Sequence, residues 1–426
     1  MELLNGELNM LFKLAWLSIL NRRSTAFLTI LSIAISVTLL LGIEQLRKSV
    51  RDSFLQTVSG IDLVVGARGD AIPILLYSVF RLGEATNNLR WQSYLEWAAD
   101  ERVEWTIPLS LGDSHRGFRV LGTNSDYWSY YRYAKNRKLV LKTGEFFDGL
   151  YEAVIGSVVA DKLGYQLNQQ IVITHGAGSA ALFEHDDQPF RIVGILKPTG
   201  TPVDQTIHVS LEAIEAIHIG WEDGFPAAEK INPEKINASE LQPKSITAFL
   251  VRLNSKMQTF RLQGEINAYE KEPLSAILPG VTMQKLWQIL GTFEKALLTV
   301  SALVVLSSLT SLTSLLLATL SERRREMSIL RSVGAGPVIV FYLLWIEATI
   351  LCFIGVFLGL IFQYGGLLAL APTIQDQLGL QILLEWPGIK EFVILLLIMA
   401  CGMLMSFFPA WRAYMISLHD GLLPKA

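Results

Sequence analysis

The chain has few cysteines and few charged residues for its length. Only two of its 426 residues are cysteine, Cys352 and Cys401, and both fall within apolar stretches, so the sequence excludes a disulfide framework bracing a soluble domain. Charged residues make up 18% of the chain and hydrophobic residues 51%. The net charge of −3 gives no reason to expect a nucleic-acid partner. This composition is typical of a membrane protein.

Catalytic and nucleotide-binding motifs are also missing from the sequence. It holds no G-x-x-x-x-G-K-[ST] phosphate loop, no G-x-S-x-G nucleophile turn and no H-E-x-x-H metal motif. No cysteine outside the apolar stretches can serve as a nucleophile. We therefore expect no catalytic residue and no ATPase site in this chain, and any energy taken from ATP must arrive through a partner.

Four apolar stretches are long enough to cross a bilayer as helices. A span needs about 20 apolar residues, and the candidates are 24–43, 296–320, 338–371 and 392–411. Residues 44–295, which separate the first span from the second, have the composition of a soluble domain. We expect the first span to remain as an anchor, because its apolar core is long for a signal peptide and no small-x-small cleavage site follows it.

Basic residues at the ends of the spans indicate the orientation, because lysine and arginine resist translocation. They predict cytoplasmic termini and an external domain. Arg47, Lys48 and Arg51, which follow the first span directly, oppose this, but long domains translocate largely regardless of charge. The residues that set the orientation are Lys13, Arg22 and Arg23 before the first span, Arg323, Arg324, Arg325 and Arg331 between the second and third, and Arg412 after the fourth.

The external region alternates short valine- and isoleucine-rich runs with helical patterns, which predicts an α+β domain. At its two ends, helical spacing predicts that the membrane helices continue outward as a stalk. We favour a stalk that transmits movement over a static anchor. The expected strands are 62–65, 103–109, 118–122, 153–156, 170–174, 190–196, 206–210 and 246–253, and the expected helices include 94–101, 158–163 and 211–219.

The predicted fold is thus four transmembrane α-helices, one before and three after a large inserted α+β domain. The expected segments are a cytoplasmic or interfacial helix 1–23, a first transmembrane helix 24–43, a stalk helix 44–59, a periplasmic core domain 60–272, a second stalk helix 273–295, a second transmembrane helix 296–320, a cytoplasmic loop 321–337, a third span region 338–371, a periplasmic loop 372–391, a fourth transmembrane helix 392–411 and a cytoplasmic tail 412–426.

The most specific pattern in the chain is the charged run ERRREMSILRSVGA at 322–335, between the second and third spans. It is followed by WIEATILCFIGVFLGLIF at 345–362 and FFPAWRAYMISLHDGL at 407–422. The outer domain carries PFRIVGILKPTGTPVDQTIHVSL at 189–211. Together these segments resemble the FtsX/MacB superfamily of ABC transporter permeases, with a MacB-type periplasmic core domain and an FtsX-like transmembrane domain, over nearly the whole chain.

The resemblance implies a permease half that forms a homodimer and is driven by a separate cytoplasmic ATPase, with ATP and Mg²⁺ bound on that partner. Nucleotide-driven movement in this family is relayed through the stalk to the outer domain, a mode called mechanotransmission. The implied role is export or extraction of a substrate from the periplasm or outer leaflet at the inner membrane, with a periplasmic adaptor and an outer-membrane duct as further partners. The alternatives are an FtsX-like regulator of a periplasmic cell-wall hydrolase and a lipoprotein-release permease.

The charged loop is the first candidate site. The resemblance implies that it docks into a cleft of the ATPase, and arginine suits this role because its planar donors pair bidentately with carboxylates. The alternative is a loop that merely obeys the positive-inside rule. The candidate coupling residues are Glu322, Arg323, Arg324, Arg325, Glu326 and Arg331.

Two features of the third span are further candidates. Glu347 is a carboxylate within an apolar stretch, which is costly unless it is paired, and we favour a structural hydrogen bond to a neighbouring span over a proton relay. Gly355 and Gly359 form a small-xxx-small step that permits close helix packing. Their partner could be another span of the same chain or a second protomer.

The outer domain contains a loop rich in potential metal ligands, HGAGSAALFEHDD. Imidazoles and carboxylates bind zinc or copper, and His175, His185, Asp186 and Asp187 are the candidates. The ten-residue gap fits no compact ligand motif, so we favour a polar hairpin loop. A metal-responsive sensor or a metal exporter is a third functional alternative that depends on this loop alone. We expect His208 and His218 to be packed or surface residues.

Overall fold

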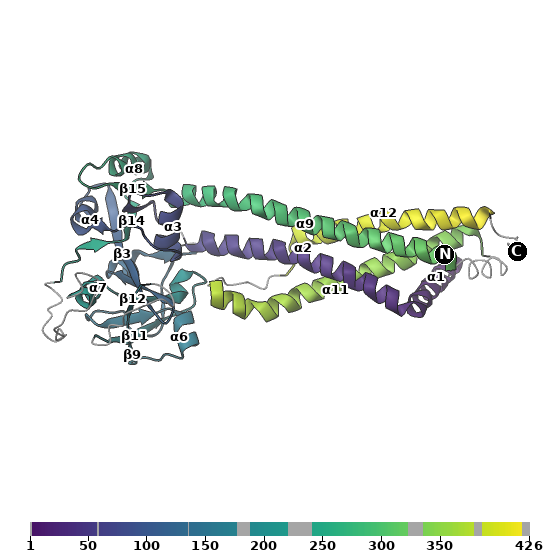
Figure 1. Ribbon diagram of the computed structural model, residues 1–426, viewed down its shortest axis with the longest axis horizontal. Coiled ribbons are helices and arrows are strands. Elements are labelled where there is room, and N and C mark those ends of the chain that lie inside the picture. The colour runs from purple at the N-terminus through teal and green to yellow at the C-terminus, as the bar shows by residue number, and fades with distance from the viewer. Residues whose placement is uncertain are drawn as a thin grey trace. The chain divides into compact units, whose positions relative to one another are not determined.

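The computed structural model describes residues 2–57, 59–134, 136–176, 188–219, 241–322, 335–378 and 386–419. The chain forms two compact units (Figure 1). The helical unit comprises Met1–Lys48, Thr292–Pro372 and Ile382–Ala426, and the α+β unit comprises Ser49–Gly291 and Thr373–Gln381.

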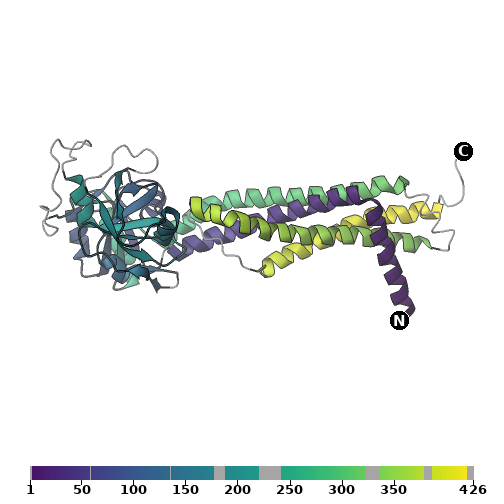
Figure 2. The ribbon, with the colours of Figure 1, turned by 90° about the horizontal axis from the view of Figure 1, so that it is seen from below.

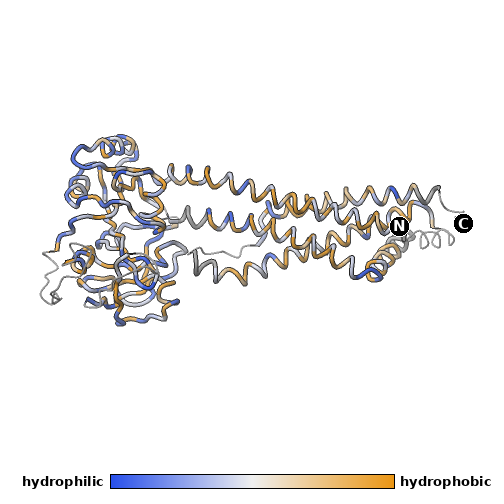
Figure 3. The backbone as a smooth tube through the Cα atoms, in the orientation of Figure 1, coloured by the Kyte–Doolittle hydropathy of each residue, from blue (hydrophilic) through white to orange (hydrophobic). Residues whose placement is uncertain are grey.

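The helical unit is built from α1 Glu2–Asn21, α2 Arg23–Thr57, α9 Pro279–Glu322, α11 Pro337–Leu378 and α12 Ile389–His419. Four of these helices are long and apolar enough to cross a membrane, over Arg23–Arg51, Pro279–Leu320, Pro337–Ala371 and Ile389–Met415. Figure 3 shows hydrophobic residues along all four. The predicted arrangement of one span, an α+β domain and three spans is confirmed.

A shared core joins the four long helices. Val37 and Leu41 of α2, Leu312 of α9, Leu351 of α11 and Ile398 of α12 belong to one buried apolar cluster. Lipid tails are as apolar as these side chains, so close packing rather than the hydrophobic effect must hold such helices together in a bilayer.

The α+β unit is organised around one large, mostly antiparallel sheet (Figure 2). In its described part the strand order is β15-β1-β14-β3-β4-β12-β8-β11-β7, and only the β4–β12 and β8–β11 pairs are parallel. The sheet strands are β1 Leu63–Ala67, β3 Val103–His115, β4 Phe118–Thr123, β7 Leu141–Gly144, β8 Glu152–Ile155, β9 Gln170–Ile171, β10 Thr174–His175, β11 Phe190–Leu196, β12 Thr206–Ser210, β14 Ala248–Leu253 and β15 Leu274–Ile277.

Strand β3 belongs to both halves of this sheet. Its first part pairs with β14, from Val103 to Leu109, and its last part pairs with β4 and β10, from Ser110 to His115. The helices outside the sheet are α3 Ala71–Phe80, α4 Trp91–Ala98, α5 Asp126–Tyr130, α6 Ser157–Leu163, α7 Leu211–His218 and α8 Thr259–Asn267. Small strands β2 Leu89–Arg90 with β13 Ser245–Ile246, and β5 Arg132–Tyr133 with β6 Arg137–Lys138, complete the unit.

Several predicted boundaries are wrong, among them two at the ends of the long helices, and the helix expected over 94–101 is α4 Trp91–Ala98. The stalk helix expected over 273–295 starts later, because Leu274–Ile277 form β15, which pairs with β1, and the helix begins at Pro279. Proline suits the first turn of a helix because its missing N–H has no partner there. Residues 372–378, expected in the periplasmic loop, continue α11. Helix α3 lies in a segment for which we predicted no helix or strand.

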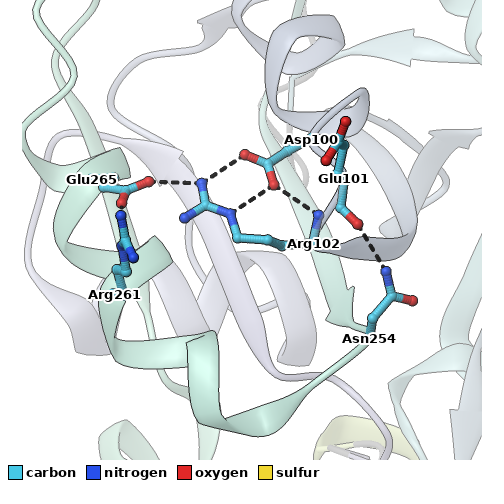
Figure 4. Close-up of polar contacts among 6 residues, drawn as sticks. All are labelled: Asp100, Glu101, Arg102, Asn254, Arg261 and Glu265. Carbon is cyan, nitrogen blue, oxygen red and sulfur yellow. Dashed lines mark hydrogen bonds and ion pairs between the residues drawn. The ribbon is translucent and has the colours of Figure 1, made fainter.

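A charged network ties α8 to the start of β3 (Figure 4). The Arg102 guanidinium donates to both oxygens of Asp100, at 2.8 and 2.7 Å, and to Glu265 Oε2 of α8 at 2.7 Å. Arg261 donates to the other Glu265 oxygen at 3.0 Å, and Asn254 donates to the carbonyl of Glu101 at 3.0 Å. Hydrogen bonding from Arg102 lowers the pKa of Asp100.

Replacing Arg102 should destabilise the α+β unit in a pH-dependent way. We expect Arg102→Ala to lower the free energy of unfolding by about 1 kcal/mol at pH 7, since the groups are partly exposed. A carboxylate with a lowered pKa contributes stability above its unfolded pKa and loses it as the pH falls through the folded pKa. The difference from wild type should therefore shrink below about pH 4. Apparent melting temperatures of the detergent-solubilised chain across this pH range measure it.

Arg261→Ala is the matched control, because its side chain is 80% exposed and contacts only one oxygen of Glu265. It should change the melting temperature much less at every pH. Equal effects of the two substitutions at pH 7 would contradict a stabilising role specific to Arg102.

Candidate functional site

The charged loop between the second and third spans connects two helices whose ends are packed together. Helix α9 ends at Glu322, and α11 begins at Pro337. Of Glu322, the structure describes the backbone and not the side chain. Just inside these ends lies a buried cluster of Leu320 from α9, Val340 and Leu344 from α11, and Ala410 and Ala413 from α12. The other candidate coupling residues, Arg323, Arg324, Arg325, Glu326 and Arg331, lie outside the described residues.

Aromatic rings extend this contact between α11 and α12. The ring centroids of Phe341 and Phe407 are 5.4 Å apart, those of Phe407 and Trp411 are 6.0 Å apart, and those of Trp411 and Tyr414 are 5.6 Å apart. These separations are favourable for aromatic pairs. A displacement of the loop would therefore act on three helices that contact one another, not on one helix end.

Glu347 is buried, with 4% of its surface exposed. Its Oε2 accepts a hydrogen bond from the Ser18 hydroxyl at 3.3 Å. Ser18 belongs to α1, which is not one of the four spans, and shares a helix face with the buried Ala15 and Ile19. The carboxylate thus helps to dock α1 against α11, which is a structural use of an otherwise costly group.

The glycine step of the third span packs against the first span of the same chain. A Cβ atom at Gly355 would lie 2.7 Å from the Cβ of Ile33, and one at Gly359 would lie 2.7 Å from the Cβ of Val37. The Thr38 hydroxyl lies 2.9 Å from the Gly359 carbonyl oxygen, which accepts its hydrogen bond. The missing side chains therefore let the α2 and α11 backbones approach closely.

Helices α11 and α12 also meet closely. The indole Nε1 of Trp345 donates to the Met403 carbonyl at 3.1 Å. A Cβ atom at Gly402 would lie 2.6 Å from the Cys352 sulfur, so this glycine makes room for the buried thiol. Both contacts hold α11 against α12 of the same chain.

The basic residues after the first span have acidic neighbours. The Arg47 guanidinium lies 2.5 Å from Glu44 Oε1 on its own helix and 3.7 Å from Glu294 Oε2 on α9. These carboxylates offset the charge that opposes the predicted orientation. Ser18 and Thr38 were not predicted from the sequence, and Arg47 was considered only as a charge that opposes the orientation, although the spacing of Glu44 and Arg47 is a readable signal for an ion pair on one helix.

The motif PTGTPVDQT of the outer domain forms a structural turn. Asp204 accepts hydrogen bonds from the backbone N–H groups of Thr199 and Gly200, both at 2.8 Å, and from the Thr199 hydroxyl at 2.8 Å. Burial raises the pKa of this carboxyl, and these hydrogen bonds oppose the rise. The quoted residues therefore shape the chain between β11 and β12.

The candidate metal loop is described only in part. His185, Asp186 and Asp187 lie outside the described residues, and of His175 the structure describes the backbone, in β10. Among the side chains that are described, no group of three His, Cys, Asp or Glu residues is arranged to hold a metal ion. His208 is fully buried against the rings of Tyr127 and Trp128, and His218 is partly exposed at the end of α7.

Comparison with known sequence families assigns most of the chain. Residues 26–269 match the family described as MacB-like periplasmic core domain, and residues 298–418 match the family described as FtsX-like permease C-terminal. The first match alone covers more than half of the 426 residues. No curated relative matches the chain.

Two solved structures are similar to about half of the chain. One is the periplasmic region of MacB from Actinobacillus actinomycetemcomitans, with 11% identity and a TM-score of 0.33, covering 55% of this chain and 97% of that one. The other is the extracellular domain of the noncanonic ABC-type transporter YknZ from Gram-positive bacteria, with 13% identity and a TM-score of 0.29, covering 51% of this chain and 98% of that one. At these scores neither likeness bears on the details of the site.

A side chain at Gly359 should separate α2 from α11. We expect Gly359→Val to destabilise the helical unit by about 1–3 kcal/mol, because the added atoms meet Val37 and the Ala34 carbonyl. Thermal unfolding of the detergent-solubilised chain measures this as a lower melting temperature. Gly365→Val is the control on the same helix, because nothing lies within 4 Å of a Cβ atom there. Equal melting temperatures for the two variants would rule out the close contact.

Proposed function

Because the chain belongs to the FtsX/MacB-like family of ABC transporter permeases, we propose that it is a permease subunit coupling ATP hydrolysis by a separate cytoplasmic ATPase to movement of its α+β unit. The observation that carries the proposal is the charged run ERRREMSILRSVGA at 322–335. It connects α9 to α11, whose ends pack with α12 in one buried cluster. Family members work with a cytoplasmic ABC ATPase. This multi-pass membrane protein would then lie in the inner membrane with both termini in the cytoplasm.

The missing phosphate loop supports a division of labour between two chains. With no G-x-x-x-x-G-K-[ST] motif in the sequence, ATP and Mg²⁺ would be bound by the partner ATPase. This chain would supply neither a nucleotide site nor a catalytic residue. Its Arg323, Arg324, Arg325 and Arg331, with Glu322 and Glu326, would dock onto the ATPase.

Two continuous helices support mechanotransmission. Helices α2 and α9 each contain a candidate span and also contribute residues to the α+β unit. The end of α2 accepts a hydrogen bond at the Thr57 carbonyl from the Tyr131 hydroxyl at 3.3 Å, and the start of α9 buries Met283 and Leu286 in the core of the α+β unit. Rigid secondary elements of this kind carry coupling between distant sites.

The work done outside would be export or extraction of a substrate from the periplasm or outer leaflet. A homodimer would pair two copies of each unit. A periplasmic adaptor and an outer-membrane duct would extend the route of the substrate out of the cell. The same machinery could instead transmit ATPase cycling to a periplasmic cell-wall hydrolase or release lipoproteins, and the partners of the chain distinguish these roles.

Affinity purification of the full chain under ATP-trapping conditions, followed by mass spectrometry, tests the proposal. Recovery of an ABC ATPase together with a periplasmic adaptor is the expected result. An ATPase recovered with a cell-wall hydrolase would replace export by regulation. Recovery of no ATPase in nanodiscs of native lipid would overturn the coupling role itself.

The double substitution Glu326→Ala with Arg331→Ala should weaken ATPase binding at least about tenfold. Each charge-assisted hydrogen bond contributes about 1.5–3 kcal/mol, and 1.4 kcal/mol corresponds to a factor of ten in affinity. Co-purified ATPase and its stimulated turnover are the measurements. Lys390→Ala, in the loop expected outside, is the control and should leave both unchanged. Unaltered ATPase binding by the double variant would remove the docking role from this loop.

A further inference from the structure

A small cavity lies in the α+β unit, between the end of α3, the segment 81–88 and a bulge of β3. Its volume is about 170 Å³. The bulge places Gly112 and Asp113 of β3 opposite Val120 of β4 alone. Bulges often occur beside functional sites, where they redirect side chains. The residues that line the cavity include Tyr77, Arg81, Glu84, Leu111, Gly112 and Arg119.

Arg81 follows α3 in a backbone conformation that favours glycine. Its φ of 60° and ψ of 24° lie in the left-handed region. Glycine is the usual residue at such helix ends, because a Cβ atom makes this conformation costly. The Arg81 side chain is partly buried, and its Nη1 donates to the Ser78 carbonyl of α3. We expect an arginine that bears this backbone cost to have a use for its guanidinium.

The positive charge of Arg81 has no acidic partner in the part of the chain that the structure describes. It lies instead near groups that are neutral at pH 7. Burial lowers the pKa of His208 to about 3, and the neighbouring Arg81 charge adds to this effect. A cation that is partly removed from water is costly unless an anion offsets it. The cavity beside Arg81 is a place where such an anion can bind.

Arg119 of β4 brings a second guanidinium to the cavity. Its side chain is 21% exposed, and its Nη2 donates to the Gly83 carbonyl at 3.0 Å. Its Nη1 lies 3.8 Å from Glu84 Oε1, which is longer than the 2.7–2.9 Å typical of a charge-assisted hydrogen bond. Glu84 is 67% exposed, and exposed ion pairs contribute little. A carboxylate in the cavity could therefore bind Arg119 more closely than Glu84 does.

Two arginines and one glutamate give the lining one net positive charge. Tyr77 adds none, because burial raises the pKa of its hydroxyl to about 12. We propose that this cavity binds the carboxylate group of a small organic anion, with Arg81 and Arg119 as its donors. The planar donors of arginine match a carboxylate. One negative charge balances the lining, whereas a phosphate group carries about −1.5 to −2 at pH 7.

The volume of the cavity limits the ligand to a group about the size of one ring. An apolar cavity of about 150 Å³ holds one benzene molecule, and sites for drug-sized ligands enclose about 300–1,000 Å³. Tyr77 and Leu111 add an aromatic ring and an aliphatic side chain to the lining. A carboxylate on a ring-sized apolar body, such as benzoate, therefore suits both the size and the chemistry of the cavity.

Fluorine NMR of 4-fluorobenzoate, titrated onto the full chain in nanodiscs, tests the proposal. We expect saturable line broadening that is absent with empty nanodiscs and with 4-fluorobenzamide, a neutral molecule with the same ring. Phenylphosphonate should displace the probe less well than benzoate does. No saturable broadening by wild type, or equal binding of the amide, would overturn the proposal. Stronger displacement by phenylphosphonate would replace the carboxylate by a phosphate-type anion.

Two arginine variants test the donors. Arg81→Gly should weaken probe binding at least about tenfold, because it removes a charge-assisted donor, and should keep a melting temperature close to that of wild type, because glycine suits the left-handed backbone. Arg119→Gln should weaken binding similarly. Arg116→Gly is the matched control, because Arg116 is exposed, has a φ of 47° and does not line the cavity. Wild-type affinity in Arg81→Gly or Arg119→Gln would contradict the assigned donors.

A third variant narrows the cavity without changing any charge. Nothing lies within 4 Å of a Cβ atom at Gly112, so Gly112→Leu should fold and should weaken probe binding at least about tenfold by filling space. Gly264→Leu in α8, where a Cβ atom is equally free of neighbours, is its control. Unchanged affinity in Gly112→Leu would place the probe elsewhere and overturn the site. No residue of the cavity belongs to the charged loop at 322–335, so all these variants should still bind the ATPase, and the two proposals can fail separately.

Discussion

The close contact between α2 and α11 is the constraint on which the helical unit depends. The first span is separated in the sequence from the other three by the whole α+β domain, so chain connectivity alone does not keep it beside them. Lipid offers no hydrophobic drive toward association, and packing must supply it. Gly355 and Gly359 do so by admitting Ile33 and Val37 against the α11 backbone, and Thr38 adds a hydrogen bond to the Gly359 carbonyl.

Strand β3 has the corresponding role in the α+β unit. Because its two ends pair with different neighbours, one strand joins both halves of the sheet. The bulge at Asp113 lies in the second half, where β4 and β10 flank it. The strand that unites the sheet therefore also carries its bulge, where Asp113 has a register partner on β10 and none on β4.

Local patterns in the sequence predicted the spans and most of the strands, because hydropathy and side-chain period are properties of short segments. They failed at Leu274–Ile277, where four residues are too few to reveal a period and the pairing with β1 decides the structure. The contacts of Glu347 with Ser18 and of Asp113 with His218 could not be predicted from the sequence, for another reason. Each joins residues far apart in the chain, so only the fold brings them together. The expectation that His218 is a packed or surface residue agrees with its side chain, which is 29% exposed.

The contacts of α2 with its two neighbours differ in kind, and this difference bears on how movement would be transmitted. With α11 the contact is at the level of the backbone, where a shift along the axis would drive Val37 into the chain at Gly359. With α9 it includes the partly exposed pair of Arg47 and Glu294, 3.7 Å apart, and such ion pairs contribute only about 0–1 kcal/mol. A weak pair can break and form again as helices slide, whereas interlocked backbones resist sliding. For the proposed mechanotransmission, α2 and α11 would therefore move as one body, and of the two contacts the Arg47–Glu294 pair with α9 would be the one that breaks and forms again.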